Sequence, residues 1–229
     1  MKPFFGALAL VFLATTARGQ VGHLPENSPY RDLETHQEFT FFGGQYSAGR
    51  DAIGVAPRGG PMFGARYEIH VGGPAVLGAR WSHVNGERFP IDPTKTGAAQ
   101  QLGKHSTSLN LYDVDLGINL TGQKSFHHLV PLINLGAGVV TCSCTVAPDP
   151  YKFGTPFAFS FGGGLRYVPG GRLQLRLDWS DYLYQLKYPP EYYIINAATN
   201  TSAVPQDQSR TFWKNNRAFT LGASLLFFR

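Results

Sequence analysis

The sequence predicts an all-β fold, a closed antiparallel transmembrane β-barrel of about eight strands preceded by a cleavable signal peptide. Three observations predict it: a leader-like N-terminal segment, repeated period-two alternation of apolar and polar residues, and regular alternation of short and long connections. Together they indicate a secreted chain whose strands present one face to lipid and the other face to a polar interior.

The first residues have the three parts of a secretory leader. A short positive start at Lys2 is followed by an uncharged, mostly apolar run over residues 4–14, and small residues at Ala17 and Gly19 precede a cleavage site ahead of Gln20. The run is too short for a membrane-spanning helix, which needs about 20 residues. A buried N-terminal helix is the less favoured alternative. We therefore expect a signal peptide at 1–19, a periplasmic N-terminal arm at 20–36 and the barrel at 37–229.

Composition narrows the class of protein. The net charge is +5, and it falls to +3 when Lys2 and Arg18 leave with the leader. This charge is too small and too scattered for a nucleic-acid-binding face. Aromatic residues make up 14% of the 229 residues, and 27 residues are glycine. With no long apolar run after the leader, this composition favours an all-β chain.

Period-two alternation marks the strands, because successive side chains of a strand point to opposite faces. The clearest case has an apolar face running from Phe63 to Val71, with polar residues between. The same pattern occurs in residues 112–120, 157–167, 173–179 and 219–227, and more weakly in 77–82 and 129–139. Residues 38–46 carry aromatics on both faces, which leaves the inward face of this segment open.

The connections distinguish a membrane barrel from a soluble sandwich. Short connections at 72–74, 121–125 and 169–171 alternate with long ones at 47–61, 84–105, 140–155 and 184–212. Outer-membrane barrels have short periplasmic turns and longer extracellular loops, whereas an immunoglobulin-like sandwich has no reason for this asymmetry. The pattern therefore favours the barrel and predicts that both chain ends lie in the periplasm.

The polar faces of the segments carry charges of both signs. An eight-stranded barrel leaves an interior that side chains can fill, so we expect ion pairs to plug the lumen. These interior residues are Arg66, Glu68, Arg80, Asp113, Asp115, Arg166, Arg176 and Asp178. Asp113 and Asp115 share a face and could serve acid–base chemistry, but pairing with inward arginines is the favoured interpretation.

Aromatic residues are expected at the two membrane interfaces. If the chain starts in the periplasm, the strand directions place Trp81, Trp179, Trp213, Tyr112 and Phe157 at extracellular strand ends. Tyr167 and Phe227 then lie at the periplasmic end.

Cys142 and Cys144 begin the third long connection, in a compartment that favours oxidation. A disulfide at this spacing needs a turn that brings the two Cα atoms close, and a local bridge is our prediction. His127 and His128 are adjacent, so on a strand they would point to opposite faces and form a poor metal pair. We expect no metal site, no cofactor and no catalytic residue.

Residues 36–229 resemble the outer membrane protein β-barrel domain family, the small eight-stranded OmpA- and OmpX-like barrels. The resemblance rests on residues 38–46, 131–138 and 161–167, and on Arg176-Leu177-Asp178 followed by Asp181-Tyr182. The family usually ends on an aromatic residue that the barrel-assembly machinery is thought to read. Here Arg229 follows Phe227-Phe228, a departure that leaves the register of that signal open.

The resemblance implies a monomer in the bacterial outer membrane, with outer-membrane lipid, lipopolysaccharide and the barrel-assembly machinery as partners and no nucleic acid. The favoured role is structural or surface-binding through extracellular loops. A narrow, porin-like pore and a lipid-modifying enzyme are the alternatives, the latter disfavoured because the chain lacks a His-X-Ser element. Residues 188–195 are the best loop candidate for a partner site, unless they only extend the flanking strands above the bilayer.

Overall fold

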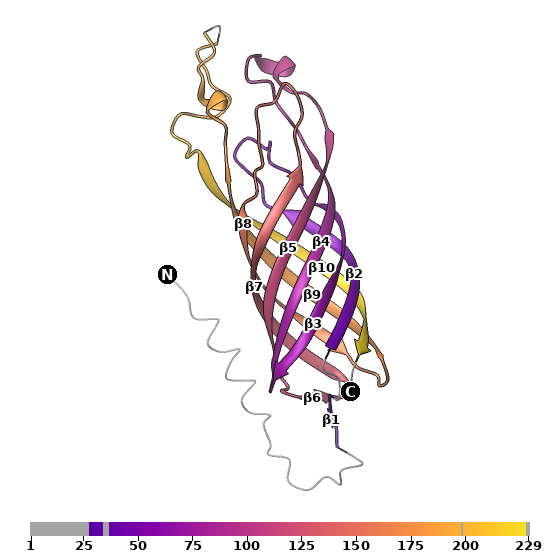
Figure 1. Ribbon diagram of the computed structural model, residues 1–229. Helices are drawn as coiled ribbons and strands as arrows, with labels where there is room; N and C mark the ends of the chain where they lie inside the picture. The colour runs from indigo at the N-terminus through magenta and orange to yellow at the C-terminus, as the bar shows by residue number, and fades with distance from the viewer. Residues whose placement is uncertain (1–27, 34–36, 198, 228–229) are drawn as a thin grey trace, which may run out of the picture.

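The computed structural model describes residues 28–33, 37–197 and 199–227. Eight antiparallel strands form a closed barrel, in which β2 pairs with β10 and β7 with β8 (Figure 1). The strands are β2 (Gln37–Ala48), β3 (Gly60–Gly72), β4 (Ala75–Arg88), β5 (His105–Asn119), β7 (Leu129–Ser143), β8 (Phe157–Tyr167), β9 (Leu173–Lys187) and β10 (Thr211–Phe227). The predicted fold class is confirmed. The predicted signal peptide lies outside the described residues.

Long and short connections lie at opposite ends of the barrel, as the sequence predicted. Loop 1 (49–59), loop 2 (89–104), loop 3 (144–156) and loop 4 (188–210) gather at one end, which we call the loop end (Figure 1). Loop 2 contains the short 3₁₀ helix η2 (Gly97–Gln100), and loop 4 contains η3 (Pro190–Tyr193). The short connections and the last residues of β10 lie at the other end, the turn end.

Two further short strands lie at the turn end. β1 (Tyr30–Asp32) belongs to the N-terminal arm and pairs antiparallel with β6 (Lys124–Phe126), within the connection between β5 and β7. The rings of Tyr30 and Phe126 lie 5.2 Å apart. The arm therefore packs on a turn of the barrel, a contact for which its sequence carried no signal.

The wall is apolar outside and mostly polar inside. The inward face of β2, which the sequence left open, consists of Glu38, Thr40, Phe42 and Tyr46, all buried, whereas Phe41 is 62% exposed. Outward-facing apolar side chains form a continuous apolar band. It comprises Phe41, residues 63–71 of β3, 77–81 of β4, 112–118 of β5, 129–139 of β7, 157–167 of β8, 173–179 of β9 and 219–227 of β10. In the described part of the chain, no helix is long and apolar enough to cross a membrane.

The strands continue past this band toward the loop end, which corrects the predicted positions of several aromatics. Trp81, Tyr112 and Trp179 lie in the middle of β4, β5 and β9, at the edge of the band, and not at strand ends. Trp213 lies farther out, beyond the outward polar residues Asn215 and Arg217. For Trp81, Tyr112 and Trp179 the predicted strand-end positions are wrong, because alternation was followed only where the outward residues are apolar.

Three further aromatics of that set lie at strand ends. Phe157 begins β8 at the loop end, while Tyr167 and Phe227 end their strands at the turn end. Beyond the apolar band the outward positions become polar on several strands: Gln45, His83, Asn110, Gln185 and Arg217. The barrel wall therefore rises above the band as a polar surface.

Candidate functional site

The turn-end half of the interior holds six interlinked charges, which we call the charge network. Its members, each 5% exposed or less, are Glu38, Arg66, Glu68, Arg166, Arg176 and Asp178. Arg166 lies 3.4 Å from both Glu38 and Glu68, and Arg66 lies 3.4 Å from Asp178. Arg176 pairs with Asp178 at 2.8 Å and also with Glu68. The network joins β2, β3, β8 and β9 across the lumen.

Glu38 is the network member that sequence reasoning missed. It lies directly opposite Glu68 on the neighbouring strand, an arrangement that is unfavourable for two like charges without compensation. Arg166 lies within ion-pair distance of both carboxylates and compensates them. The ambiguous pattern of residues 38–46 hid this inward position.

Nearer the loop end, Arg80 and Asp113 form a separate pair. They are cross-strand neighbours, and Arg80 Nη2 lies 2.6 Å from Asp113 Oδ2. Asp115 is also buried, but among the described residues it forms no ion pair, and its recorded polar partner is the Asn134 amide at 3.4 Å. The expected pairing of Asp115 with an arginine is wrong, because its cross-strand neighbour is Gly78, whereas Arg80 faces Asp113.

Glycines make room for the inward carboxylates. A Cβ added to Gly78 would lie 2.5 Å from Asp115 Oδ1, and one added to Gly164 would lie 2.5 Å from Asp178 Oδ1. Both contacts are far shorter than ordinary van der Waals separation. Glycine at these two positions therefore leaves room for the neighbouring inward carboxylates, where a larger residue would clash with them.

The interior changes character toward the loop end. There the inward side chains include the buried tyrosines Tyr46, Tyr182 and Tyr184, packed with Leu109 and Leu111 in one apolar cluster. The Tyr46 and Tyr184 hydroxyls lie 3.2 Å apart, within hydrogen-bonding distance. Ring packing thus takes over from ion pairing as the lumen approaches the loops.

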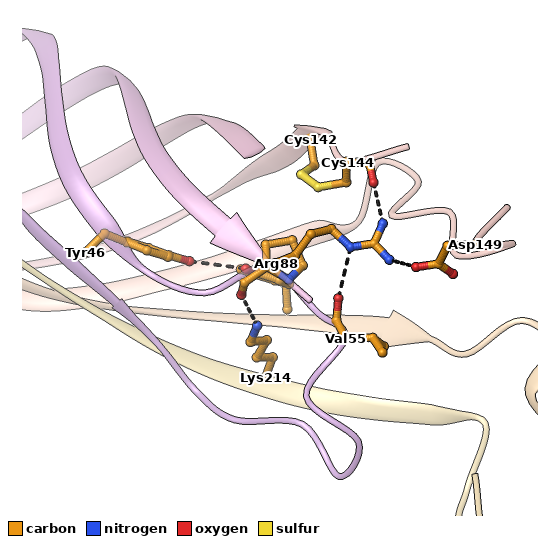
Figure 2. Close-up of a disulfide and its surroundings, with 9 residues drawn as sticks. Tyr46, Val55, Arg88, Cys142, Cys144, Asp149 and Lys214 are labelled. Carbon is orange, nitrogen blue, oxygen red and sulfur yellow. Dashed lines mark hydrogen bonds and ion pairs between the residues drawn. A yellow bond between two sulfur atoms is a disulfide. The ribbon is translucent and has the colours of Figure 1, made fainter. Parts of the chain in front are cut away.

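Above this cluster lies a buried group that we call the loop hub: Val55, Arg88, Cys144, Asp149 and Tyr192. Arg88 is fully buried and points between the loops (Figure 2). Its Nε donates to the Val55 carbonyl at 3.2 Å, and its Nη atoms donate to the Cys144 carbonyl and the Asp149 carboxylate. The Tyr192 hydroxyl donates to Asp149 Oδ1 at 2.5 Å.

The hub ties all four loops together. Val55 belongs to loop 1, Arg88 ends the strand that leads into loop 2, Cys144 and Asp149 belong to loop 3, and Tyr192 belongs to η3 in loop 4. Burial raises the pKa of the Tyr192 phenol, and the hydrogen bond to Asp149 and its negative charge raise it further. The neutral phenol is therefore the form that the hub holds.

A second carboxylate fastens loop 1 to loop 4. Asp51 accepts from the Tyr188 hydroxyl at 2.9 Å and from the backbone N–H groups of Val55 and Ala56 at 3.1 and 3.2 Å. Burial, followed by the charge of Asp51, raises the pKa of Tyr188. The loop end is thus held by hydrogen bonds to charged groups, buried in the hub and partly buried at Asp51, and such bonds are stronger than those between neutral groups.

The two cysteines lie beside the hub. The structure joins Cys142 and Cys144 in a disulfide with Cα atoms 5.3 Å apart, at the end of β7 (Figure 2). The Cys144 carbonyl is one of the acceptors of Arg88. Sequence reasoning missed the hub because Arg88 and Asp149 lie in segments without alternation and carry no local motif.

The loop segment favoured from the sequence has a different form. Pro190–Tyr193 is the 3₁₀ helix η3 and not an extension of the strands. Tyr188 and Tyr192 are buried, whereas Ile194 and Ile195 are 66% and 53% exposed. The segment therefore contributes aromatics to the loop core and presents two isoleucines outward.

Two hollows open between the loops. One of about 450 Å³ is lined mainly by apolar side chains of loops 2, 3 and 4, namely Pro93, Pro148, Pro150, Ile194 and Ala197, with Asp92, Thr94, Glu191 and Asn196. The other, of about 290 Å³, is lined by several cationic side chains. Among the described residues no three His, Cys, Asp or Glu side chains are placed to hold a metal ion.

These features define a class: a closed eight-stranded antiparallel barrel with an apolar outer wall, a polar-filled interior and long loops at one end. The crystal structure of the outer membrane protein OprG from Pseudomonas aeruginosa is similar (TM-score 0.55, 11% identity), covering 86% of this chain and 100% of that chain. Neisserial surface protein A is also similar (TM-score 0.52, 9% identity), covering 83% and 97%. The predicted resemblance in fold to small outer-membrane barrels is confirmed. No protein-family model and no curated protein matches the sequence.

Proposed function

We propose that this protein is a bacterial outer-membrane barrel that acts at the cell surface through its loops, with the filled barrel as a rigid anchor. In this placement the loop end faces the outside and the turn end faces the periplasm. The chain is exported, inserted as a monomer by the barrel-assembly machinery, and surrounded by outer-membrane lipid and lipopolysaccharide. The apolar band supports this placement, since it matches the lipid-facing surface of such barrels.

The loop hub is the observation that carries the proposal. Loops that had only to connect strands would not need a buried ion pair and a network of hydrogen bonds joining all four of them. Ordering a loop before binding lowers the entropy cost of recognition, and function commonly lies in loops on a rigid scaffold. The hub therefore supports a preorganised recognition surface.

The interior argues against the pore. The charge network and the tyrosine cluster fill the lumen at successive levels, and their side chains are buried. Reconstituted protein should therefore show little steady conductance in planar bilayers. Large, stable channels from the wild-type protein would contradict the proposal and favour the porin-like role. No arrangement in the described residues favours lipid-modifying chemistry.

The test of loop recognition removes the tip of loop 4 and keeps the hub. The tip closes by the Asn196–Thr201 bridge, while Tyr192 and Val204 are buried below it. Replacing 196–201 by two glycines should leave heat-modifiable gel mobility unchanged. Cells displaying the variant should bind less to immobilised host matrix proteins or envelope components than wild-type cells do.

The matched control lengthens the turn at 169–171, at the opposite end of the barrel, by two glycines. This change should alter neither assembly nor attachment. If the tip variant assembles and attaches as the wild type does, this part of loop 4 is not the recognition surface.

A further inference from the structure

A basic groove lies between loop 3 and the two ends of loop 4. Its cations are Lys152, Lys187 and Arg210, and its volume is about 290 Å³. Pro150, Tyr188, Pro189, Pro190 and Glu191 complete the lining. The volume is near the lower end of the range for small-molecule sites, so the groove suits one compact chemical group with its immediate substituents.

The charges of the groove are not compensated locally. Within the described ranges, none of the three cations forms an ion pair, whereas Lys95, Lys104 and Lys124 pair with Asp92, Glu87 and Asp32. Glu191 is the only carboxylate in the lining of the groove. Three positive groups and one negative group in a concave surface attract an anion, and the arginine can hold a phosphate or carboxylate in two-point geometry.

The position of the groove indicates the source of its ligand. Lys187 is the last residue of β9 and is cross-strand neighbour to Thr211 of β10, while the Tyr188 N–H donates to the Arg210 carbonyl at 2.8 Å. By alternation Lys187 lies on the outward face of β9, the same face as Trp179. Trp179 marks the edge of the apolar band. The groove therefore borders the outer wall of the barrel.

Its height can be derived from strand geometry. Lys187 follows Trp179 by eight positions on β9, which is about 26 Å along a strand at about 3.3 Å per residue. With a strand tilt of about 40° this becomes about 20 Å above the edge of the band. That level is beyond the lipid tails and their immediate headgroups, in the layer that membrane-anchored saccharides occupy.

We propose that the basic groove binds phosphate or carboxylate groups on the saccharide part of lipopolysaccharide in the surrounding leaflet. The inference rests on the proposed outer-membrane placement. Lys152, Lys187 and Arg210 neutralise the anionic group, while Glu191 accepts hydrogen bonds from sugar hydroxyls. A carboxylate in the wall disfavours bare inorganic phosphate, which presents more negative charge and fewer donors.

The experiment uses the full mature chain, refolded in lipid nanodiscs. Binding is measured with lipopolysaccharide that carries a complete phosphorylated core, with lipopolysaccharide truncated to its lipid part, and with inorganic phosphate alone. The test variant is K152Q/K187Q/R210Q. The control variant is R50Q/K95Q/K104Q, which removes three exposed loop cations outside the groove and changes the net charge equally.

The test variant should lose at least about tenfold in affinity for the complete lipopolysaccharide, and its binding should depend less on salt. The control should stay within about threefold. Equal losses of affinity in the test and control variants would mean that only the net charge matters, and this would overturn the proposal. Equal affinity of the wild type for truncated lipopolysaccharide would contradict the saccharide assignment, and tight binding of phosphate alone would make the groove a free-anion site.

Surface accessibility of the loops to protease on intact cells separates the two proposals. If the loops are accessible but groove variants bind the complete lipopolysaccharide as the wild type does, only the groove inference fails. If the loops are inaccessible from outside, the proposed function fails as well.

Discussion

The charge network and the loop hub both bury arginines with carboxylates, yet they differ in what holds them. In the network, strand register places six charges on β2, β3, β8 and β9, so the sheet positions the side chains. In the hub, one ion pair joins Arg88, at the end of β4, to Asp149 of loop 3, which has no regular strand pairing, so the side chains position the loop backbone. The charge network fills a barrel whose geometry is set by the strands. The loop hub, in contrast, orders loops that have little regular secondary structure of their own.

Replacing Arg176 by Ala should produce the largest effect. It leaves Glu68 with a weaker partner at 3.4 Å and removes the 2.8 Å contact of Asp178, at a cost of about 3–5 kcal/mol for a broken buried ion pair. Urea unfolding in lipid vesicles measures the loss. Arg176→Met, which keeps most of the volume, is the control for packing. A loss below about 1 kcal/mol in Arg176→Met, beside a large loss in Arg176→Ala, would mean that the network adds little beyond filling space.

Replacing Arg88 by Met should affect the loops and leave the barrel intact. Asp149 then stays buried with only hydrogen-bonding partners, and the local opening free energy of the loops should fall by about 3 kcal/mol. Limited proteolysis should show faster loop cleavage with unchanged heat-modifiable mobility. If loop cleavage and global unfolding change together, the hub and the barrel form one cooperative unit and the contrast between them is lost.

Alkaline pH should open the hub before the barrel. Because the folded pKa of Tyr192 is raised, its contribution to stability is complete below about pH 10, the ordinary pKa of tyrosine. It decreases as pH rises above that value toward the folded pKa, by at most about 1.4 kcal/mol per pH unit. Loop proteolysis between pH 9 and 11 should accelerate in the wild type and less in Tyr192→Phe. Identical pH profiles would exclude Tyr192 as the titrating group.

Asp115→Asn should have the smallest effect, below about 1 kcal/mol, because Asp115 forms no ion pair within the described residues and an amide oxygen can still accept from Asn134. Asp113→Asn is the contrasting variant, since it weakens the 2.6 Å pair with Arg80 and should cost about 3 kcal/mol or more. Urea unfolding of both variants compares them. Equal losses would show that Asp115 depends on the interior arginines at longer range.

The wall of the barrel was predictable because alternation reports which face of a strand meets which environment. Arg66, Arg166 and Asp178 could be placed inside from this pattern alone. Glu38 could not, since aromatics on both faces of β2 obscured the period, and the partner of Asp115 depended on a register that no local pattern encodes. The predicted strand ends at Trp81 and Trp179 were wrong because the outward residues beyond them become polar, which ends the alternation of apolar and polar residues before the strand itself ends.

The hub was not predictable from the chain. Arg88 and Asp149 are 61 residues apart, and neither belongs to a motif or a periodic segment. Their meeting depends on how four irregular loops fold over one another. The β1–β6 pairing is a similar case, since three residues of an arm and three of a turn carry too little pattern to predict their contact.

The charge network also bears on the order in which the sheet assembles. Arg66 and Asp178 are 112 residues apart, and Arg176 and Glu68 are 108 apart, so the partners approach only when strands from both halves of the chain curl around a common axis. An open sheet would keep the local pairs Arg176–Asp178 and Arg80–Asp113, but it would hold Arg66 away from Asp178 and Arg176 away from Glu68. Closure of the seam between β2 and β10 is thus the event that brings the two halves of the charge network together.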